Sequence, residues 1–187
     1  MRRLIIIGAG GHGRCCLDIA REMKIYDEIL FADDGSVGQN VNGVQVLGKV
    51  EDVFQLARED YEVFVAIGNN GIRKDLMIRL KENGYSFASL ISPRSCISEY
   101  TVLGSGCVIY PNVVIESNVK MGDGCIATSN ASINHDAIIG DFCLVYSNSV
   151  IRPNAILEDL VRVGSGCVIS FGTRVNTQSD ISDGSLI

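Results

Sequence analysis

Two adjacent side chains, His135 and Asp136, have the residue types that acid–base chemistry requires. An imidazole with an ordinary pKa of about 6.5 can accept a proton from an amine or a hydroxyl near neutral pH. A carboxylate beside it can hold one ring tautomer and raise the basicity of the ring. We therefore take His135 as the candidate general base and Asp136 as its partner.

The number of histidines limits the other chemistry that this chain can support. His12 and His135 are the two histidines of the sequence, whereas a zinc site of the three-histidine type needs a third. We therefore expect no metal. No cysteine or serine lies in a nucleophile motif, so we expect direct transfer between two bound substrates rather than a covalent enzyme intermediate.

A glycine-rich turn, GAGGHG at residues 8–13, follows a predicted strand at 3–7 and precedes a predicted helix at 14–23. Glycines let the backbone approach a ligand closely, and the free amides at the start of a helix favour phosphate. This arrangement indicates a phosphate-containing ligand.

An acidic pair, Asp33 and Asp34, ends the next predicted strand at residues 28–32. Asp33 lies 20 residues after Gly13, close to the spacing at which an acidic side chain receives a ribose hydroxyl. The glycine spacing alone is a weak signal, but together with the acidic pair it indicates a nucleotide.

The rest of residues 1–90 completes half of a Rossmann-type α/β domain. The sequence predicts, in order, a short apolar segment at 44–47, a helix at 50–58, a strand at 63–67, the turn Gly68-Asn69-Asn70 and a helix at 72–83. A full dinucleotide domain has two βαβαβ halves, and about ninety residues hold only one. The sequence therefore favours a nucleoside diphosphate over NAD.

A six-residue repeat runs through residues 91–187 without an insertion. Aliphatic or small apolar residues recur at every sixth position from Ile91 to Ile187, and a small side chain follows four residues after nearly every one. A period of six is neither helical nor simply alternating, so each hexad is one short strand and one corner. Three hexads close one coil, and stacked coils bury the aliphatic ladder inside a prism.

The seven cysteines are an odd number without CxxC spacing, which favours reduced thiols over a disulfide framework. Cys107, Cys125 and Cys143 follow one another at intervals of three hexads and therefore stack in one column, and Cys167 takes the same repeat position in another. They are either small apolar corner fillers, the interpretation that we favour, or a metal or redox ladder.

The composition bears on the partners and the compartment. The chain has 22 acidic and 16 basic residues and a net charge of −6, which argues against nucleic acid. Its apolar runs are far shorter than the roughly 18 residues that span a bilayer. Arg2 and Arg3 precede only four aliphatic residues, too few for a signal peptide. We expect a cytoplasmic protein that does not bind membranes.

The hexads resemble those of the hexapeptide-repeat acyltransferases, and this resemblance implies a left-handed parallel β-helix of triangular section for residues 91–187. The whole chain is similar to acetyltransferases of nucleotide-activated sugars in bacterial glycan synthesis, of the sialic acid O-acetyltransferase and bacillosamine-pathway N-acetyltransferase kind. The similarity is carried by GAGGHG at 8–13, FADD at 31–34, VAIGNNGIRK at 65–74 and INHD at 133–136.

This resemblance implies that an acetyl group moves from acetyl-CoA to the amino group of a nucleotide-linked amino sugar, with His135 as general base and Asp136 as its partner. It also implies a set of residues that hold the nucleotide sugar: Gly10, Gly11, His12, Asp33, Asp34 and Gly68. Acetylation of a sugar hydroxyl and a noncatalytic nucleotide-binding scaffold stay open as alternatives. The sequence does not name the sugar or its nucleotide.

The flat faces of a three-sided prism predict a homotrimer, with His135 at an outer edge between subunits. The expected contact surface consists of the outward aliphatic residues of the hexads: Val102, Val108, Val114, Ile126, Ile138, Leu144, Val150 and Ile156.

The acetyl-CoA contacts stay unassigned, because the chain departs from the family at this point. Leu144 stands where the related enzymes have a histidine that touches acetyl-CoA, and the sequence stops at Ile187 without the usual Gly-x-Pro-Ala-Lys tail. The cations that could meet its phosphates are Lys120, Arg152, Arg162 and Arg174. Arg162 and Asp180 are separated by three hexads, a spacing at which they can pair with each other instead.

Overall fold

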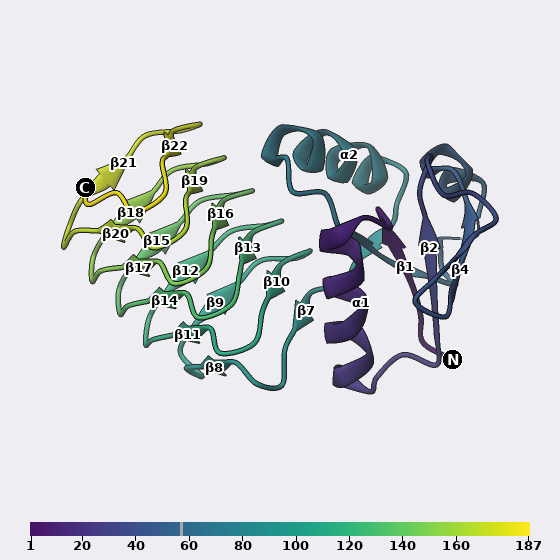
Figure 1. Cartoon of the computed structure of the whole chain (residues 1–187), viewed down its shortest axis with the longest axis horizontal. Helices are drawn as coiled ribbons and strands as arrows, with labels where there is room; N and C mark the ends of the chain where they lie inside the picture. The colour runs from purple at the N-terminus through teal and green to yellow at the C-terminus, as the bar shows by residue number, and fades with distance from the viewer. Residues whose placement is uncertain (57) are drawn as a thin grey trace. The chain divides into compact units, whose positions relative to one another are not determined.

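The computed structural model describes residues 1–56 and 58–187, which form two compact units, Met1–Leu90 and Ile91–Ile187 (Figure 1). The first unit is an α/β domain, and the second is a left-handed β-helix of stacked short strands. The fold class predicted from the motifs and the six-residue repeat is confirmed.

The first unit is built on a six-stranded sheet with the order β3-β4-β2-β1-β5-β6. Its strands are β1 (Arg3–Ile7), β2 (Glu28–Ala32), β3 (Asn40–Val41), β4 (Val44–Gly48), β5 (Glu62–Val65) and β6 (Ser86–Phe87). β3 is antiparallel to β4, and the other neighbours are parallel. β1 lies between β2 and β5, and its aliphatic residues 4–7 are fully buried, as expected for a strand covered on both faces.

The helices of this unit differ in detail from the prediction. α1 (Gly11–Met23) and α2 (Asn70–Glu82) begin three and two residues earlier than expected, because glycine and polar residues in a first turn leave no mark on the apolar pattern. The segment predicted as a helix at 50–58 is a 3₁₀ helix, η1 (Val50–Gln55), which ends because the backbone of Leu56 is extended (φ −83°, ψ 153°). Ala57, within that prediction, lies outside the described residues.

The strand order changes direction at β1. The chain leaves β1 for β2 on one side and returns to β5 on the other, so the turns after β1 and β5 adjoin at the carboxyl ends of the strands. This is the switch point at which open α/β sheets bind ligands. The two turns are pressed together there, since a Cβ atom on Gly8 would lie 2.8 Å from the carbonyl oxygen of Ala66.

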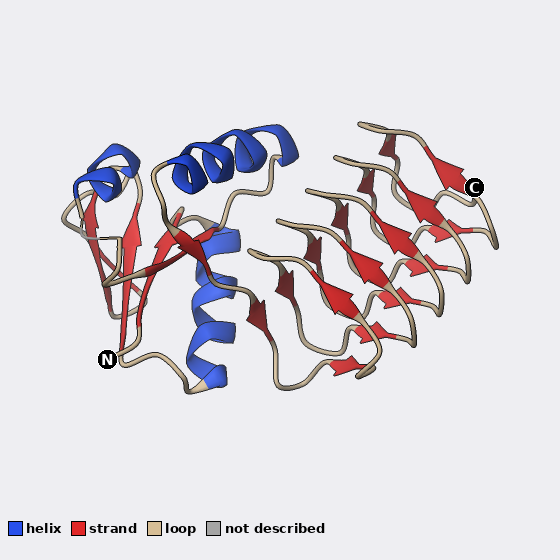
Figure 2. Cartoon of the chain, turned by 180° about the vertical axis from the view of Figure 1, so that it is seen from behind, coloured by secondary structure: helices blue, strands red, loops and turns tan. Residues whose placement is uncertain are grey.

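The second unit consists of two-residue strands in three parallel sheets, ordered β22-β19-β16-β13-β10-β7, β20-β17-β14-β11-β8 and β21-β18-β15-β12-β9 (Figure 2). Paired strands are offset by three hexads, as in Val114 with Ser132. The strands are β7 (Leu90–Ile91), β8 (Cys96–Ile97), β9 (Val102–Leu103), β10 (Val108–Ile109), β11 (Val114–Ile115), β12 (Lys120–Met121), β13 (Ile126–Ala127), β14 (Ser132–Ile133), β15 (Ile138–Ile139), β16 (Leu144–Val145), β17 (Val150–Ile151), β18 (Ile156–Leu157), β19 (Arg162–Val163), β20 (Val168–Ile169), β21 (Arg174–Val175) and β22 (Asp180–Ile181).

The interior of the coils is the aliphatic ladder that the repeat predicted. Every sixth residue from Ile109 to Val175 is buried. Toward the ends of the ladder Ile91, Ile97, Leu103 and Ile181 are half-buried, and the last residue, Ile187, is exposed. Burial of a side chain of this size contributes roughly 1.5–3 kcal/mol, so the ladder is the main source of stability of this unit.

The corner thiols are hydrogen-bonded as well as buried. The Sγ atoms of Cys125 and Cys143 donate to the carbonyl oxygens of Gly140 and Glu158, each at 3.0 Å. The hydroxyl of Ser149 makes the same kind of bond to the carbonyl oxygen of Gly164, at 2.6 Å. None of the seven cysteines forms a disulfide in the structure, and burial raises the pKa of the Cys125 thiol. The buried cysteines of the β-helix are therefore corner fillers that also satisfy a carbonyl group.

The residues expected to form the surface for self-association are unequally exposed. Three of its residues, on adjacent strands of one sheet, are at most 3% exposed: Val108, Ile126 and Leu144. The outward residues Val102, Val114 and Ile138 on the other two sheets are 62%, 39% and 42% exposed.

Candidate active site

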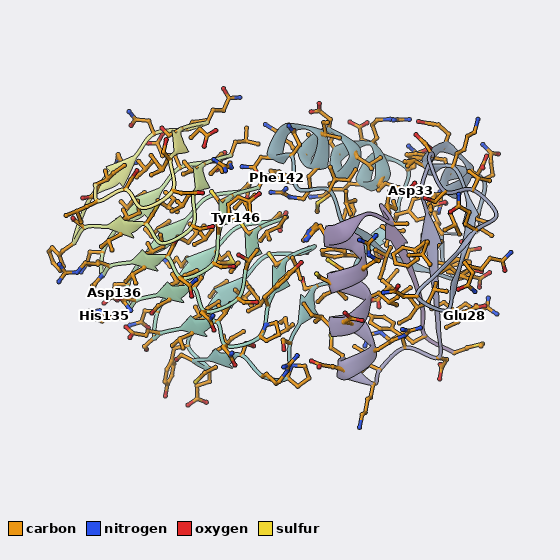
Figure 3. The ribbon with its side chains drawn as sticks, viewed as in Figure 1. Glu28, Asp33, His135, Asp136, Phe142 and Tyr146 are labelled. Atoms are coloured by element: carbon orange, nitrogen blue, oxygen red, sulfur yellow. The ribbon has the colours of Figure 1, made fainter. Side chains whose placement is uncertain are left out.

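His135 and Asp136 occupy the corner between β14 and β15, where Figure 3 shows both side chains on the outside of the stacked coils. The Nδ1 atom of His135 lies 2.7 Å from Oδ2 of Asp136, and the two side chains are 52% and 45% exposed. Asp136 is left-handed (φ 61°), a conformation that Asp tolerates better than most residues.

The charge of Asp136 determines which ring nitrogen of His135 carries the proton. The hydrogen bond with His135, followed by that with Asn118, lowers the pKa of the Asp136 carboxyl below its usual value. An ionised carboxylate only accepts hydrogen bonds, so Nδ1 of the neutral imidazole holds the proton. Within the described part of the chain Nε2 has no hydrogen-bond partner, and the His135 side chain is 52% exposed.

The neighbouring coils hold the backbone of this corner. The N–H of His135 donates to Oε2 of Glu116 at 2.9 Å, and its carbonyl oxygen accepts from the N–H of Asn154 at 3.3 Å. The N–H of Asp136 donates to the carbonyl oxygen of Ser117 at 3.1 Å. Hydrogen bonds to the preceding and the following coil therefore hold the backbone of the exposed His135–Asp136 pair in place.

In the first unit, α1 begins with an uncapped turn. Its N-cap residue is Gly10, no side chain caps it, and no acidic residue lies in its first turn among those described. The N–H groups of such a turn carry partial positive charge and lack partners within the helix, so they favour an anion. At α2, by contrast, the side chain of Asn69 accepts the N–H of Ile72 at 2.9 Å, which leaves α1 as the more open of the two helix starts.

The glycines of the predicted nucleotide site have no packing role in the chain. A Cβ atom on Gly10 or Gly68 would meet nothing within 4 Å, and one on Gly11 would meet only Nη2 of Arg14 at 4.0 Å. Gly13 differs, because a Cβ atom there would lie 1.9 Å from the carbonyl oxygen of Gly8. Gly13 thus lets α1 approach the turn, whereas the other three border open space.

The acidic pair is engaged with the backbone. Oδ2 of Asp33 accepts the N–H of Ala9 at 2.9 Å, and its Oδ1 accepts the N–H of Gly35 at 2.9 Å. Oδ1 of Asp34 accepts the N–H of Val50 at 2.9 Å. Asp33 therefore ties the end of β2 to the glycine turn. Asp34 is exposed, and its second oxygen has no partner among the described residues.

His12, predicted as a ligand-binding residue, lies in the first turn of α1 and is largely buried. Burial, followed by the nearby charge of Arg73, lowers the pKa of His12 from 6.5 to about 4. The imidazole is therefore neutral near pH 7, and it can exchange hydrogen bonds with a ligand but brings no charge to a phosphate.

Sequence reasoning missed Arg73, which is fully buried on α2. Its Nη1 donates to the carbonyl oxygens of Ile67 at 2.8 Å and Gly68 at 3.1 Å, and its Nη2 donates to Oδ1 of Asn70 at 2.9 Å. It thus fixes the turn that contains Gly68. A signal was present, since Arg73 lies inside the motif VAIGNNGIRK.

Two of the cations considered for acetyl-CoA are paired. Arg162 forms an ion pair with Asp180, as their spacing predicted, and Arg174 pairs with Glu158 at 2.7 Å. In the described part of the chain, no cluster of three or more His, Cys, Asp or Glu residues is arranged to hold a metal ion. No described helix is both long and apolar enough to span a membrane.

The chain thus combines an α/β domain that has an open helix start with a left-handed β-helix that presents an exposed His–Asp corner. A model of the PglD N-terminal domain matches residues 3–80, and a model of the bacterial transferase hexapeptide (six repeats) matches residues 136–171.

Comparison with solved structures narrows the class of protein. The acetyltransferase domain of PglB from Neisseria gonorrhoeae, in complex with acetyl coenzyme A, is 30% identical, with a TM-score of 0.91 over 99% of this chain and 95% of that one. The chain therefore belongs to the hexapeptide-repeat acetyltransferases that carry a PglD-type N-terminal domain, as the motifs predicted.

Two curated proteins share part of the sequence. GDP-perosamine N-acetyltransferase of Escherichia coli is 32% identical over 119 residues, which are 60% of this chain and 52% of that protein. UDP-N-acetylbacillosamine N-acetyltransferase of Bacillus subtilis is 30% identical over 111 residues, 58% and 51% of the respective chains. The matched region thus spans about half the length of each of these relatives.

Proposed function

We propose that this protein transfers an acetyl group from acetyl-CoA to the amino group of a nucleotide-linked amino sugar. The observation that carries the proposal is the His135 corner, where Asp136 holds Nδ1 at 2.7 Å and the described part of the chain gives Nε2 no hydrogen-bond partner. The names of both curated relatives, which are N-acetyltransferases of nucleotide sugars, support the amine as acceptor.

The reaction needs one base and no covalent enzyme intermediate. Acetyl-CoA supplies the acetyl group as a thioester; the amine nitrogen bonds to the acetyl carbon as the carbon–sulfur bond breaks. Nε2 of His135 accepts the proton that leaves the nitrogen, and Asp136 stabilises the imidazolium. The imidazolium then returns this proton to the departing thiolate, so that the base is regenerated.

The nucleotide is assigned to the first unit. The open first turn of α1 receives the diphosphate, and the bare backbone at Gly10, Gly11 and Gly68 lets the ligand approach. The free oxygen of Asp34 accepts a hydrogen bond from the nucleoside, and Asp33 shapes the turn. Neutral His12 completes the site as a hydrogen-bonding partner.

The acetyl-CoA contacts of the chain stay open in this proposal. Leu144, at the position of the histidine in related enzymes, is 3% exposed. Arg162 and Arg174 already have acidic partners. We therefore name no residue for the phosphates of acetyl-CoA.

The assembly proposed for the enzyme is a homotrimer in the cytoplasm. The exposed aliphatic residues Val102, Val114 and Ile138 lie on the two sheets that meet at the His135 corner, so a second subunit packed there would border the base. Seven cysteines without a disulfide among them suit a reducing compartment. Light scattering should give about three times the 20.2 kDa of one chain; a monomer at micromolar concentration would exclude the trimer.

The decisive experiment combines binding and turnover over UDP-, GDP- and dTDP-linked amino sugars. A cognate ligand at about 100 times its dissociation constant should stabilise the protein by about 2.7 kcal/mol. With acetyl-CoA, the same sugar should release CoA and gain one acetyl group on nitrogen by mass spectrometry. A product acetylated on oxygen would show that a sugar hydroxyl, and not the amine, is the acceptor. Ligand binding without release of CoA would favour the noncatalytic scaffold.

A further inference from the structure

The coil that precedes the His135 corner contributes two side chains to it. β11 pairs with β14 in the register Val114 with Ser132 and Ile115 with Ile133, and this register places residues 116–118 directly beside 134–136. Nδ2 of Asn118 donates to Oδ1 of Asp136 at 3.3 Å, while Oε2 of Glu116 accepts the N–H of His135 at 2.9 Å.

In these contacts each oxygen of the Asp136 carboxylate has a different hydrogen-bond partner. Oδ2 faces the imidazole, and Oδ1 faces the amide of Asn118. A side chain that is 45% exposed would otherwise rotate freely about its terminal bond. The amide restricts this rotation, and as a donor to the charged form it also lowers the pKa of Asp136.

Resting on the function proposed above, we propose that Asn118 and Glu116 are positioning residues for the general base. Asn118 holds the plane of the Asp136 carboxylate so that Oδ2 stays on Nδ1 of His135. Glu116 fixes the peptide from which the imidazole projects. Together they keep the proton on Nδ1 and the lone pair of Nε2 directed outward, where an amine is to be deprotonated.

Another corner of the same β-helix supplies the matched comparison. Nδ2 of Asn130 donates to Oδ1 of Asn148 at 3.2 Å across the same interval of one coil. Asn130 and Asn118 are both left-handed, with φ values of 63° and 59°. The two asparagines thus share backbone geometry and type of bond, but only Asn118 faces a carboxylate that holds an imidazole.

Replacement by glycine tests the side-chain amide without changing the backbone conformation. It adopts a positive φ without strain, so Asn118→Gly removes the side-chain bond and leaves the turn intact. Asn130→Gly is the control. Asp136→Gly removes the carboxylate, again without backbone strain, because Asp136 also has a positive φ. Glu116→Gln keeps an oxygen that accepts the N–H of His135, whereas Glu116→Ala does not.

The first readout is the tautomer of His135 in the protein without ligand, measured by long-range ¹H–¹⁵N correlation spectra. His12 is readily distinguished, because its pKa is about 4. We expect the Nδ1–H population to fall in Asn118→Gly and Glu116→Ala, and to match the unmodified protein in Asn130→Gly and Glu116→Gln. An unchanged tautomer in Asn118→Gly would overturn the proposal without bearing on the transfer reaction.

The second readout is a kinetic cycle with the nucleotide sugar found in the assay above. Asn118→Gly should lower kcat about tenfold, the size of one lost hydrogen bond to a charged group, and leave KM within about twofold. In the Asp136→Gly background it should have no further effect, because it acts through that carboxylate. An equal loss in both backgrounds would refute positioning through Asp136. If the tautomer shifts but the unmodified protein transfers no acetyl group, the proposed function fails and the positioning stands.

Discussion

Oδ2 of Asp33 accepts a hydrogen bond from the N–H of Ala9 at 2.9 Å, which fastens the end of β2 to the glycine turn after β1. The predicted ligand-binding carboxylate is thus part of the support of the turn, and its neighbour Asp34 is the one that retains a free oxygen. The two acidic residues should therefore respond differently to substitution.

Asp34→Ala should raise KM for the nucleotide sugar about tenfold and leave KM for acetyl-CoA nearly unchanged, because it removes a ligand contact worth about 1.4 kcal/mol. Asp33→Ala should instead lower the free energy of unfolding by about 1–3 kcal/mol, since two backbone N–H groups lose their acceptor. Steady-state kinetics and urea unfolding measure the two effects. Equal damage to both Michaelis constants in Asp34→Ala would argue against this site.

Gly10→Ala and Gly68→Ala should fold with an unchanged or slightly higher Tm, because a methyl group there meets open space. The same methyl group should obstruct the nucleotide and weaken its binding by about tenfold or more, as measured by calorimetry. Gly13→Ala is the stability control: its Cβ atom would overlap the carbonyl oxygen of Gly8, so this variant should lose stability. Full affinity in Gly10→Ala and Gly68→Ala would place the ligand elsewhere.

His135→Ala should lower kcat by about 10²–10⁴ while nucleotide-sugar affinity stays within a few fold. Asp136→Asn should lose less, because it leaves the imidazole that accepts the proton in place. Both side chains are about half exposed, so the Tm should change little. Near-normal turnover of His135→Ala between pH 6 and 9 would require another base.

The free energy of unfolding should depend on pH in a way that reflects the lowered pKa of His12. Its pKa in the folded protein is about 4, below the ordinary 6.5, so between these values the unfolded chain binds a proton that the folded chain does not. Stability therefore falls as pH falls from about 6.5 to 4, by at most about 3 kcal/mol. His12→Gln should remove this component in urea titrations at several pH values. Identical pH dependence of the two proteins would contradict a neutral, buried His12.

The corner thiols offer a test of their second role. Cys143→Ser should cost less than about 1 kcal/mol, because Ser149 makes the equivalent bond to a carbonyl oxygen elsewhere in the coils. Cys143→Ala should cost about 1–3 kcal/mol, since it leaves a small void and the carbonyl group of Glu158 without its thiol donor. Chemical denaturation distinguishes the two variants, and a serine variant as unstable as the alanine variant would contradict the role of the hydrogen bond.

The β-helix was largely predictable because its information is local. Each ladder residue packs on those one hexad and one coil away, so the spacing alone fixed the register that pairs Val114 with Ser132. The bond from Ala9 to Asp33 could not be read in the same way, because it joins two turns through the order of a sheet. The burial of Leu144 could not be predicted from the repeat either, because the repeat assigns this position to the outside of the coils.

The site was predicted as a set of residue types, and the structure adds their charges and partners. The motif marked His12 as a ligand-binding residue, but its neutral state follows from its burial and from Arg73, which no spacing rule selected. Asn118 carried a signal in hindsight, since it lies three hexads before Asp136.

Because each coil contains three hexads, the direction in which a corner points depends on how many hexads precede it. An insertion of one whole coil before His135 adds a complete turn and leaves every later corner facing as it did. An insertion of a single hexad also preserves the interior ladder, yet it turns all later corners by one face of the triangle, a third of a revolution. Such a chain would keep its apolar core and present the imidazole on a different edge of the prism, so only insertions of whole coils upstream of this corner preserve the direction in which His135 points.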